Sequence, residues 1–162
     1  GWLNICGVLR GTPVIDTFLP WPKSLLLHAV SFIEGWDYSD LISLSRSQSE
    51  PRYDGFVPPV QLTILNYVGI PFSGQVSKLG REFYGMLRQH GPNDGLTLIP
   101  DALAPGYTIM AVGTDHFVNN DPLIDLKTAA LVPVILKLIE SREAGAVVSG
   151  DHGEAYWAKR GR

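Results

Sequence analysis

The pattern of hydrophobic and polar positions first shows three short apolar segments with the composition of β-strands, at residues 2–6, 60–68 and 107–112. Short segments that are apolar at most positions suit strands covered on both faces, as in a parallel sheet. The connections between them are long enough for helical crossovers, and such connections join parallel strands. We therefore predict that the three segments are parallel neighbours in this order.

Apolar residues at helical spacing predict helices in these connections. Two apolar stripes follow one another between Trp21 and about Arg46. Two further helices are predicted at residues 79–89 and 126–142, where Pro133 either kinks the last helix or marks the start of its main segment. We interpret the first stripe as ordinary core rather than as the wall of a ligand pocket. Its residues are Leu25, Leu26, His28, Ala29, Phe32 and Ile33.

Polar and turn-forming residues mark the segments between these elements. Residues 43–53 are rich in Ser, Gln and Glu and are predicted to form an exposed loop. The two prolines at 58–59 favour an extended entry into the second strand, which we expect to end at Gly69. Residues 144–162 have the composition of a weakly ordered C-terminal tail. The sequence therefore predicts one α/β domain over residues 1–143, without an internal repeat or a second domain.

Composition and charge narrow the function classes. With 162 residues, of which 45% are hydrophobic, the chain is long enough for one domain with a core. The formal net charge is −3, and the 13 Lys and Arg residues are scattered apart from a short basic run at 159–162. This distribution argues against a nucleic acid as the main partner, because a phosphate-binding face needs clustered cations. No apolar run approaches the roughly 20 residues of a membrane span.

Cys6 is the single cysteine of the chain, which excludes an internal disulfide and leaves the compartment open. Because Cys6 lies in an apolar strand, we expect a buried, inert thiol rather than a nucleophile. The chain begins directly on the first predicted strand, without an initiator Met or a signal-like segment, and this suggests an incomplete N-terminus.

A carboxylate and an imidazole follow the second and the third strand. Asp94 lies in a Pro-Asn-Asp-Gly turn, and His116 comes soon after Gly113, which ends the third strand. Ligand sites of open parallel sheets lie beyond the carboxyl ends of the strands, so both side chains are expected at one crevice. An acid that orients a histidine needs this arrangement. Taken alone, Asp94 is equally well explained as an ordinary turn residue.

Other chemistry at these residues has weaker support. Asp115 is adjacent to His116 in sequence, and since adjacent side chains diverge, we expect Asp115 to bind the loop backbone instead. A metal site built from Asp115, His116, His90 and the pair at 151–152 would have irregular ligand spacing. No Gly-x-Gly-x-x-Gly follows a strand, which excludes a dinucleotide site of the Rossmann type. The sequence predicts no cofactor and no metal.

Three short motifs resemble the acid loop and the histidine loop of α/β-hydrolases, in particular lipase-like serine esterases. They are Asn93-Asp94-Gly95, Pro105-Gly106 and Asp115-His116-Phe117. The family order is nucleophile, acid, histidine, and the chain contains the last two in that order. The resemblance implies the C-terminal part of an α/β-hydrolase fold, with a short parallel sheet of about three strands flanked by helices and a helical cap inserted at about residues 17–50. It also implies that Asp94 and His116 are catalytic.

The nucleophile of this family is missing, because no Gly-x-Ser-x-Gly occurs in the 162 residues. The resemblance thus implies a serine upstream of the chain. The chain itself would be the C-terminal fragment of a carboxylic-ester hydrolase and would be inactive alone. Its substrate would be a small apolar ester or acyl compound, which the aromatic residues of the cap would suit. These residues are Phe18, Trp21, Phe32 and Trp36.

An alternative function is a non-catalytic binding module, or an incomplete hydrolase relic, without turnover. A truncated sheet that begins at residues 2–6 would also expose an apolar edge strand, through which the chain could self-associate or pair with its missing half.

The resemblance also predicts one specific contact. The Asp94 carboxylate and the His116 imidazole should lie within hydrogen-bond reach, about 2.6–3.2 Å, through Nδ1 of the ring. Nε2 should then face the opening in which the serine would stand.

Overall fold

The structure of the chain is a computed structural model that describes residues 1–72, 74–78 and 80–143. Its elements form two compact units, Gly1–Lys127 and Thr128–Arg162. In chain order they are β1 (Trp2–Ile5), α1 (Pro13–Phe18), α2 (Ser24–Glu34), α3 (Tyr38–Ser43), α4 (Arg46–Asp54), β2 (Ile64–Ile70), α5 (Gly80–Leu87), η1 (Ile99–Ala102), β3 (Tyr107–Val112), η2 (Val118–Asn120) and α6 (Ile124–Glu143).

Helix α6 begins in the first unit and continues into the second, and Pro133 lies in its interior. Within the described ranges, no helix is both long enough and apolar enough to cross a membrane. The tail predicted at residues 144–162 lies outside the described residues.

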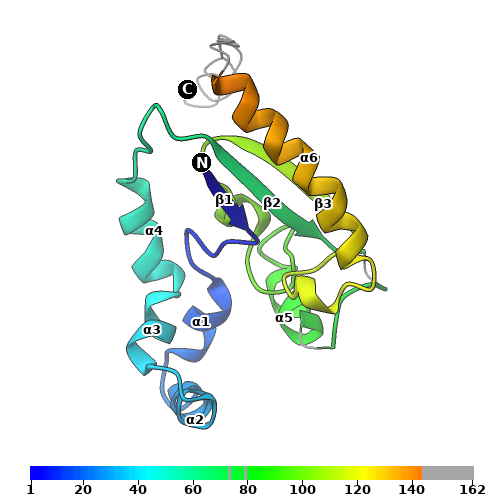
Figure 1. The fold of residues 1–162 in the computed structure, drawn as a ribbon. Helices are drawn as coiled ribbons and strands as arrows, with labels where there is room; N and C mark the ends of the chain where they lie inside the picture. Colours follow the sequence, from blue (N-terminus) through cyan, green and yellow to red (C-terminus); the bar gives the residue numbers. More distant parts are fainter. Residues whose placement is uncertain (73, 79, 144–162) are drawn as a thin grey trace. The chain divides into compact units, whose positions relative to one another are not determined.

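The three predicted strands form a parallel sheet in the predicted order β1-β2-β3 (Figure 1). Residues 2–5 align with residues 64–67, and residues 65–70 align with residues 107–112. The central strand β2 is buried along nearly its whole length. The prediction of strand direction and order is therefore confirmed, and β1 lies at one edge of the sheet as far as the chain is described.

The bounds of β2 differ from the predicted segment, residues 60–68, because the strand runs from 64 to 70 and includes Gly69. Backbone from the segment after β3 approaches this glycine closely. A Cβ at Gly69 would lie 2.6 Å from the carbonyl oxygen of Thr114 and 2.8 Å from that of Asp115. Gly69 is therefore a site of close backbone approach and not the residue that ends the strand.

Two buried asparagines join the sheet to the segment that leads into β3. Asn4 of β1 is aligned with Asn66 of β2, and its Nδ2 donates to Asn66 Oδ1 at 2.8 Å and to Ala102 O at 2.7 Å. Asn66 donates to Ala104 O at 2.8 Å and accepts from Ala104 N–H at 2.9 Å. Because the Asn66 side chain is fully buried, it loses its hydrogen bonds to water when the chain folds. The bonds to Asn4 and Ala104 compensate for this loss.

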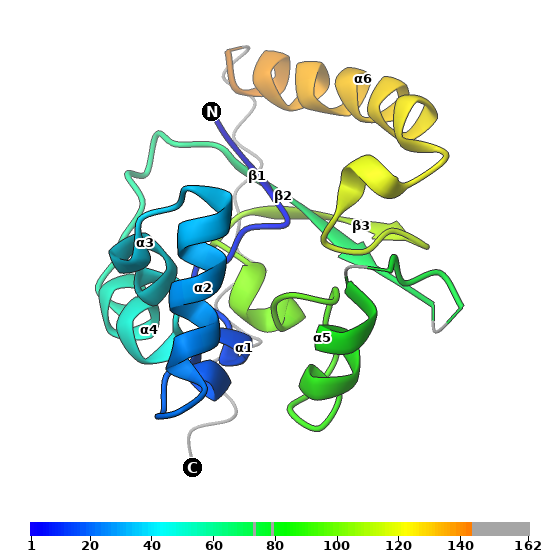
Figure 2. The same ribbon diagram turned by 90° about the horizontal axis from the view of Figure 1, so that it is seen from below.

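A small apolar cluster holds the helices next to the acid-bearing segment. Its buried members are Val14 from α1, Leu87 from α5, and Leu98, and Phe18 and Phe83 pack against them. Figure 2 shows α1, α2 and α5 on the same side of the sheet. The helix predicted at residues 79–89 is present as α5, with its buried face turned to this cluster.

Residues 43–53, predicted as an exposed loop, instead contain most of helix α4. Its N-cap residue Ser45 makes no capping hydrogen bond with its side chain. The cap is supplied by Asp16, 30 residues earlier, whose carboxylate accepts from the N–H of Arg46 at 2.7 Å and of Ser47 at 3.3 Å. A carboxylate stabilises a helix N-terminus. The loop prediction was wrong because this cap comes from another element and leaves no local sequence signal.

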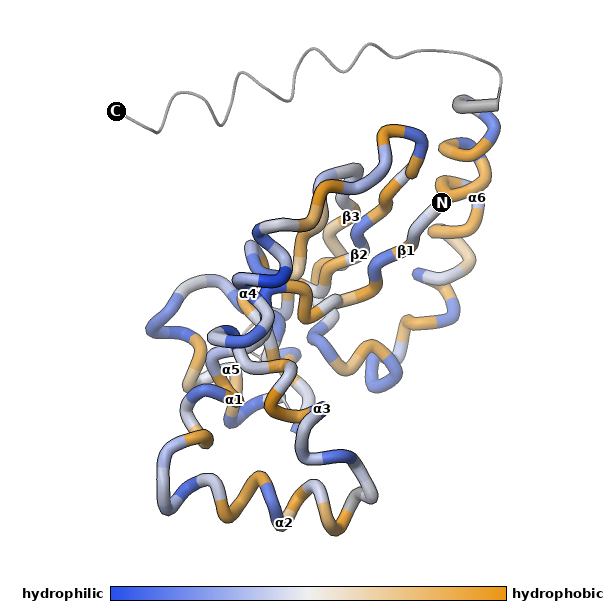
Figure 3. The backbone as a smooth tube through the Cα atoms, turned by 90° about the vertical axis from the view of Figure 1, so that its left-hand side faces the viewer, coloured by the Kyte–Doolittle hydropathy of each residue, from blue (hydrophilic) through white to orange (hydrophobic). Residues whose placement is uncertain are grey.

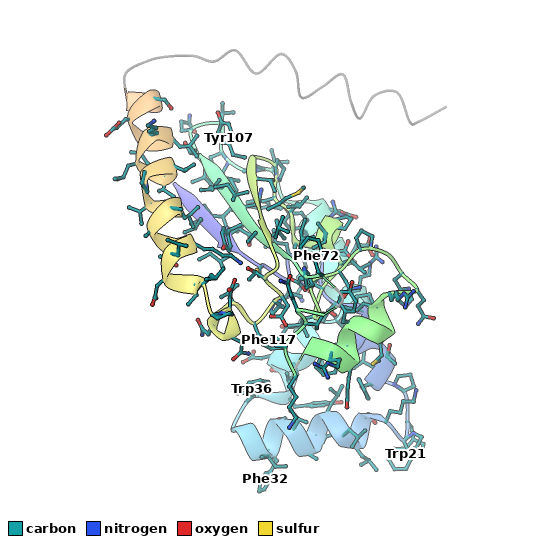
Figure 4. All side chains as sticks on the ribbon, turned by 90° about the vertical axis from the view of Figure 1, so that its right-hand side faces the viewer. Trp21, Phe32, Trp36, Phe72, Tyr107 and Phe117 are labelled. Atoms are coloured by element: carbon teal, nitrogen blue, oxygen red, sulfur yellow. The ribbon has the colours of Figure 1, made fainter. Side chains whose placement is uncertain are left out.

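The apolar stripe of α2, interpreted above as core, is exposed in the part of the chain that the structure describes. α2 contacts α1 and α3, and its buried residues are Leu27 and Ser31. Figure 3 shows hydrophobic positions recurring along α2, and Figure 4 shows Phe32 projecting outward from it. The core interpretation is therefore wrong for most of the stripe. The exposed fractions are 53% for Leu25, 57% for Leu26, 89% for Phe32 and 76% for Ile33.

Cys6 is buried, as predicted, but it lies directly after β1, which ends at Ile5, and not within the strand. Its φ of 44° lies in the left-handed region that residues other than Gly rarely adopt, and its N–H donates to Tyr67 O at 2.8 Å. Burial raises the pKa of the Cys6 thiol to about 11, and the nearby carboxylates of Asp94 and Asp115 add to the increase. The thiol is therefore protonated at neutral pH.

Replacing Asn66 tests the buried amide network. Asn66→Ala should lower the free energy of unfolding by about 3 kcal/mol, because it leaves the Ala104 N–H and one amide hydrogen of Asn4 with fewer partners in a buried site. Urea unfolding followed by circular dichroism measures this change. Asn119→Ala, at an exposed asparagine, is the matched control and should change stability by less than about 0.5 kcal/mol. Equal losses for the two variants would contradict the role of the network.

Alkylation tests the state of Cys6. At pH 8 the native protein should react with iodoacetamide at least about 100-fold more slowly than the urea-unfolded protein, because burial both shields the thiol and suppresses the thiolate. Mass spectrometry of timed samples measures the two rates. Rapid modification without denaturant would show that the thiol is accessible and ionised.

Candidate active site

Asp94 is held in a tight turn by the residues that follow it, within the segment 91–98 that we call the acid loop. Its N–H donates to Thr97 O at 3.1 Å, and its Oδ1 accepts from Leu96 N–H at 3.0 Å and from Thr97 N–H at 2.8 Å. Gly95, with a φ of 95°, lets the chain turn at this point. The Asp94 side chain is fully buried, so backbone amides rather than water stabilise its charge.

The acid loop is also tied to the turn that follows β1. Thr12 Oγ1 donates to Leu96 O, and Thr97 Oγ1 donates to Gly11 O at 3.2 Å. Thr12 and Thr97 are both almost completely buried. The chain leaving β1 therefore helps to fix the position of the acid loop, although the two segments lie far apart in sequence.

His116 lies in the segment 113–121 after β3, which we call the histidine loop. Gly113 turns the chain with a φ of 79°, and its N–H donates to Ile70 O at 2.8 Å. The N–H of His116 donates to the carbonyl oxygen of Asp94 at 2.7 Å, and His116 Nδ1 lies 2.9 Å from Asp94 Oδ2. The predicted contact through Nδ1 is confirmed, and the backbone of His116 binds Asp94 as well.

This geometry gives the two nitrogens of His116 different tasks. An ionised carboxylate only accepts hydrogen bonds, so Nδ1 carries the proton that lies between the ring and Asp94. Nε2 has no hydrogen-bond partner among the described residues. The imidazole is 16% exposed while the carboxylate is 0% exposed, so the ring reaches solvent away from Asp94. A histidine oriented in this way can accept a proton at Nε2.

Asp115 binds the loop backbone, as predicted, and does not replace Asp94 as the partner of the imidazole. Its Oδ2 accepts from Ser77 N–H at 2.7 Å, and its Oδ1 accepts from Phe117 N–H at 2.9 Å. A Cβ at Gly80 would lie 3.0 Å from Asp115 Oδ2, so the first residue of α5 packs directly on this carboxylate. Asp115 thus joins the histidine loop to the segment before α5.

A second polar cluster at the ends of the histidine loop was not predicted from the sequence. Thr114, Asp121 and Lys127 bind one another there. In the sequence, Asp121 precedes a proline in a polar turn, and Lys127 lies in the helix predicted at residues 126–142 without a distinguishing motif. Neither pattern differs from that of solvated residues, so the sequence contains no signal for this cluster.

The residues considered for a metal site are not brought together within the part of the chain that is described. Among those residues, no group of three or more His, Cys, Asp or Glu side chains lies close enough to hold a metal ion. His90 is exposed beyond the end of α5. Asp151 and His152 lie outside the described residues.

Two solved structures resemble the fold. No family model matches the sequence, and no curated protein matches it. The crystal structure of the metagenomic carboxyl esterase MGS0156 aligns with a TM-score of 0.57 and 20% identity, over 76% of this chain and 40% of that chain. The crystal structure of the Bacillus licheniformis lipase BlEst2 in its mature form aligns with a TM-score of 0.57 and 19% identity, over 82% and 53% of the two chains.

This likeness concerns the fold, because the sequence identities are low and the chain spans about half or less of each structure. Both structures are α/β-hydrolases, and this chain has a three-stranded parallel sheet, β1-β2-β3, with helices in the connections between its strands. The predicted fold class is confirmed. The chain has a partial α/β-hydrolase fold.

Proposed function

We propose that Asp94 and His116 are the acid and the base of a carboxylic-ester hydrolase whose serine nucleophile lies upstream of this chain. The hydrogen bond of 2.9 Å between Asp94 Oδ2 and His116 Nδ1 carries the proposal. A histidine oriented by a buried acid, with Nε2 left open, is the unit that activates a serine. The two similar structures are those of a carboxyl esterase and a lipase, which supports an ester as the substrate.

In the proposed reaction, the serine oxygen attacks the ester carbonyl while His116 Nε2 takes the serine proton. Asp94 stabilises the imidazolium that forms, through the existing hydrogen bond to Nδ1. His116 then donates this proton to the departing alcohol, which leaves an acyl-serine. Water hydrolyses the acyl-serine with the same imidazole as base, and the acid product and free serine are released. The oxyanion-hole amides would also come from the upstream part.

Exposed aromatic residues support an apolar acyl or alcohol group in the substrate. Trp21, Phe32 and Trp36, at and beside α2, are 77%, 89% and 56% exposed. They lie in the stretch of about residues 17–50 for which we propose a cap. Side chains of this kind suit apolar ligands, and in this proposal they line the approach to the catalytic pair.

The upstream nucleophile is directly testable. We expect the coding sequence upstream of Gly1 to contain Gly-x-Ser-x-Gly on a strand-turn-helix segment, as this family requires. Sequencing of the genomic region and of the transcript checks this. An in-frame stop without such a motif would contradict the proposed function and support the alternative of a binding module or relic, in which a ligand is bound without turnover.

Substitutions in the full-length protein test the two residues. Asp94→Asn should lower kcat for a p-nitrophenyl ester about 10⁴-fold, because an amide cannot hold the imidazole in the required tautomer. His116→Ala should lower it about 10⁵–10⁶-fold, because the base is lost. Steady-state kinetics measures both effects, and circular dichroism verifies that each variant is folded.

Two substitutions of the same type serve as controls. His90→Ala removes an exposed histidine beyond the end of α5, and Asp54→Asn removes a carboxylate that pairs with Arg10. Both variants should keep kcat within about twofold, because surface changes of this kind have small effects. Unchanged activity of His116→Ala would reject the proposed base. The chain without an upstream segment should show no ester hydrolysis above the uncatalysed rate.

A further inference from the structure

We propose that Thr114, Asp121 and Lys127 form an anchor that positions the histidine loop, so that the ring of His116 stays on Asp94. This inference rests on the proposed function of the Asp94–His116 pair and adds three positioning residues to it. All three residues belong to the unit Gly1–Lys127.

The anchor is a compact set of charge-assisted hydrogen bonds. Lys127 Nζ donates to Asp121 Oδ2, to Thr114 Oγ1 at 2.5 Å and to Val112 O at 3.2 Å. Thr114 Oγ1 donates its own proton to Asp121 Oδ2 at 2.5 Å, and Asp121 Oδ1 accepts from Leu123 N–H at 2.9 Å. The hydroxyl of Thr114 thus donates its single proton to Asp121 and accepts from Lys127, so it links the two charged groups.

Burial makes these bonds difficult to replace by water. Thr114 is 1% exposed, and the side chains of Asp121 and Lys127 are 4% and 22% exposed. Desolvation by itself would raise the pKa of Asp121, but the hydrogen bonds from Lys127, Thr114 and Leu123 lower it below its usual range. Asp121 is therefore ionised at neutral pH. Removing Lys127 would leave a buried negative charge without its counter-ion.

The anchor joins both ends of the histidine loop to one ammonium group. Val112 and Thr114 lie on the side where the loop leaves β3, and Asp121 lies on the side where it enters α6. Asp115 fixes the middle of the loop through Ser77 N–H and Phe117 N–H. The backbone on both sides of His116 is therefore held by contacts that do not involve the imidazole.

The ring depends on this support, because it has little of its own. Among the described residues, the only hydrogen bond of the His116 side chain is the one to Asp94. A single hydrogen bond makes only a modest net contribution to stability, so it tolerates little strain from a displaced loop. Loss of the anchor should increase the fraction of time that the imidazole leaves Asp94.

A cavity of about 310 Å³ beside the anchor makes conservative replacements possible. Its lining includes Gln75, Gly113, Asp115, Asp121 and Lys127. In Lys127→Arg, the larger guanidinium group therefore has room, and the positive charge is kept. Thr114 and Lys127 can therefore each be replaced in two ways, by a residue that removes the hydrogen bonds and by one that keeps them.

The experiment measures how firmly His116 is held, without relying on ester hydrolysis. In ¹⁵N-histidine-labelled full-length protein, the Nδ1–H of His116 is assigned with His116→Gln, and its exchange with solvent is measured by NMR. Thr114→Val and Lys127→Met should speed this exchange about tenfold or more, the factor expected when a hydrogen bond to a charged group is lost. Thr114→Ser and Lys127→Arg should restore the slow exchange. Arg10→Met, which removes another cation paired with a carboxylate, should leave it unchanged.

The outcomes separate this inference from the proposed function. Slow exchange in folded Thr114→Val and Lys127→Met would overturn the anchor, whatever the esterase activity of the unaltered protein. Fast exchange in these two variants, with rescue by the conservative variants, would support it even if no ester is hydrolysed. If Lys127→Met fails to fold, Thr114→Val, which keeps the side-chain shape and removes only a hydroxyl, decides the question. Fast exchange in Arg10→Met or in both conservative variants would also overturn the anchor, because it would show a general loss of stability.

Discussion

The meeting of the acid loop and the histidine loop depends on one buried group, the carboxylate of Asp94. A carboxylate without solvent is unfavourable unless hydrogen-bond donors surround both oxygens. Two backbone amides of the acid loop bind Oδ1, and the imidazole of His116 binds Oδ2. Both loops must therefore meet, and they can do so because Gly69 has no side chain where the histidine loop crosses β2. The position of His116 follows from this requirement and from the open backbone at Gly69.

Sequence patterns predicted the elements that place this pair. Three apolar segments at most nine residues long, separated by helical patterns, are sufficient to indicate a parallel sheet. Because the strands are parallel, the segments that follow β2 and β3 start at the same end of the sheet. Asp94 and His116 lie in these two segments and could therefore be expected to meet. The resemblance to α/β-hydrolases added the choice of Nδ1, and the divergence of adjacent side chains assigned Asp115 to the loop backbone. Local patterns and a general rule of topology were enough for this part.

Tertiary interactions account for what the sequence did not predict. The N-terminal cap of α4 comes from Asp16, although the local pattern predicts an exposed loop. The apolar stripe of α2 is exposed, although its pattern predicts core. The Asn4–Asn66 network and the anchor of the histidine loop are built from polar residues that the sequence presents as ordinary. Whether a polar side chain is solvated or buried with partners depends on elements far away in the chain. Periodicity, which reports one element at a time, does not contain this information.

Among the described residues, the contacts that orient His116 come from Gly1–Lys127. Asp94 and the anchor fix the imidazole through elements that follow the expected position of the serine in the chain. A serine from an upstream segment would therefore meet a base that is already oriented, and alignment of these groups is a large part of the rate advantage of an active site. The entropy of ordering the imidazole is lost when this unit folds, not when substrate binds. The acid and the histidine can thus be one folded element that a nucleophile from elsewhere in the protein completes.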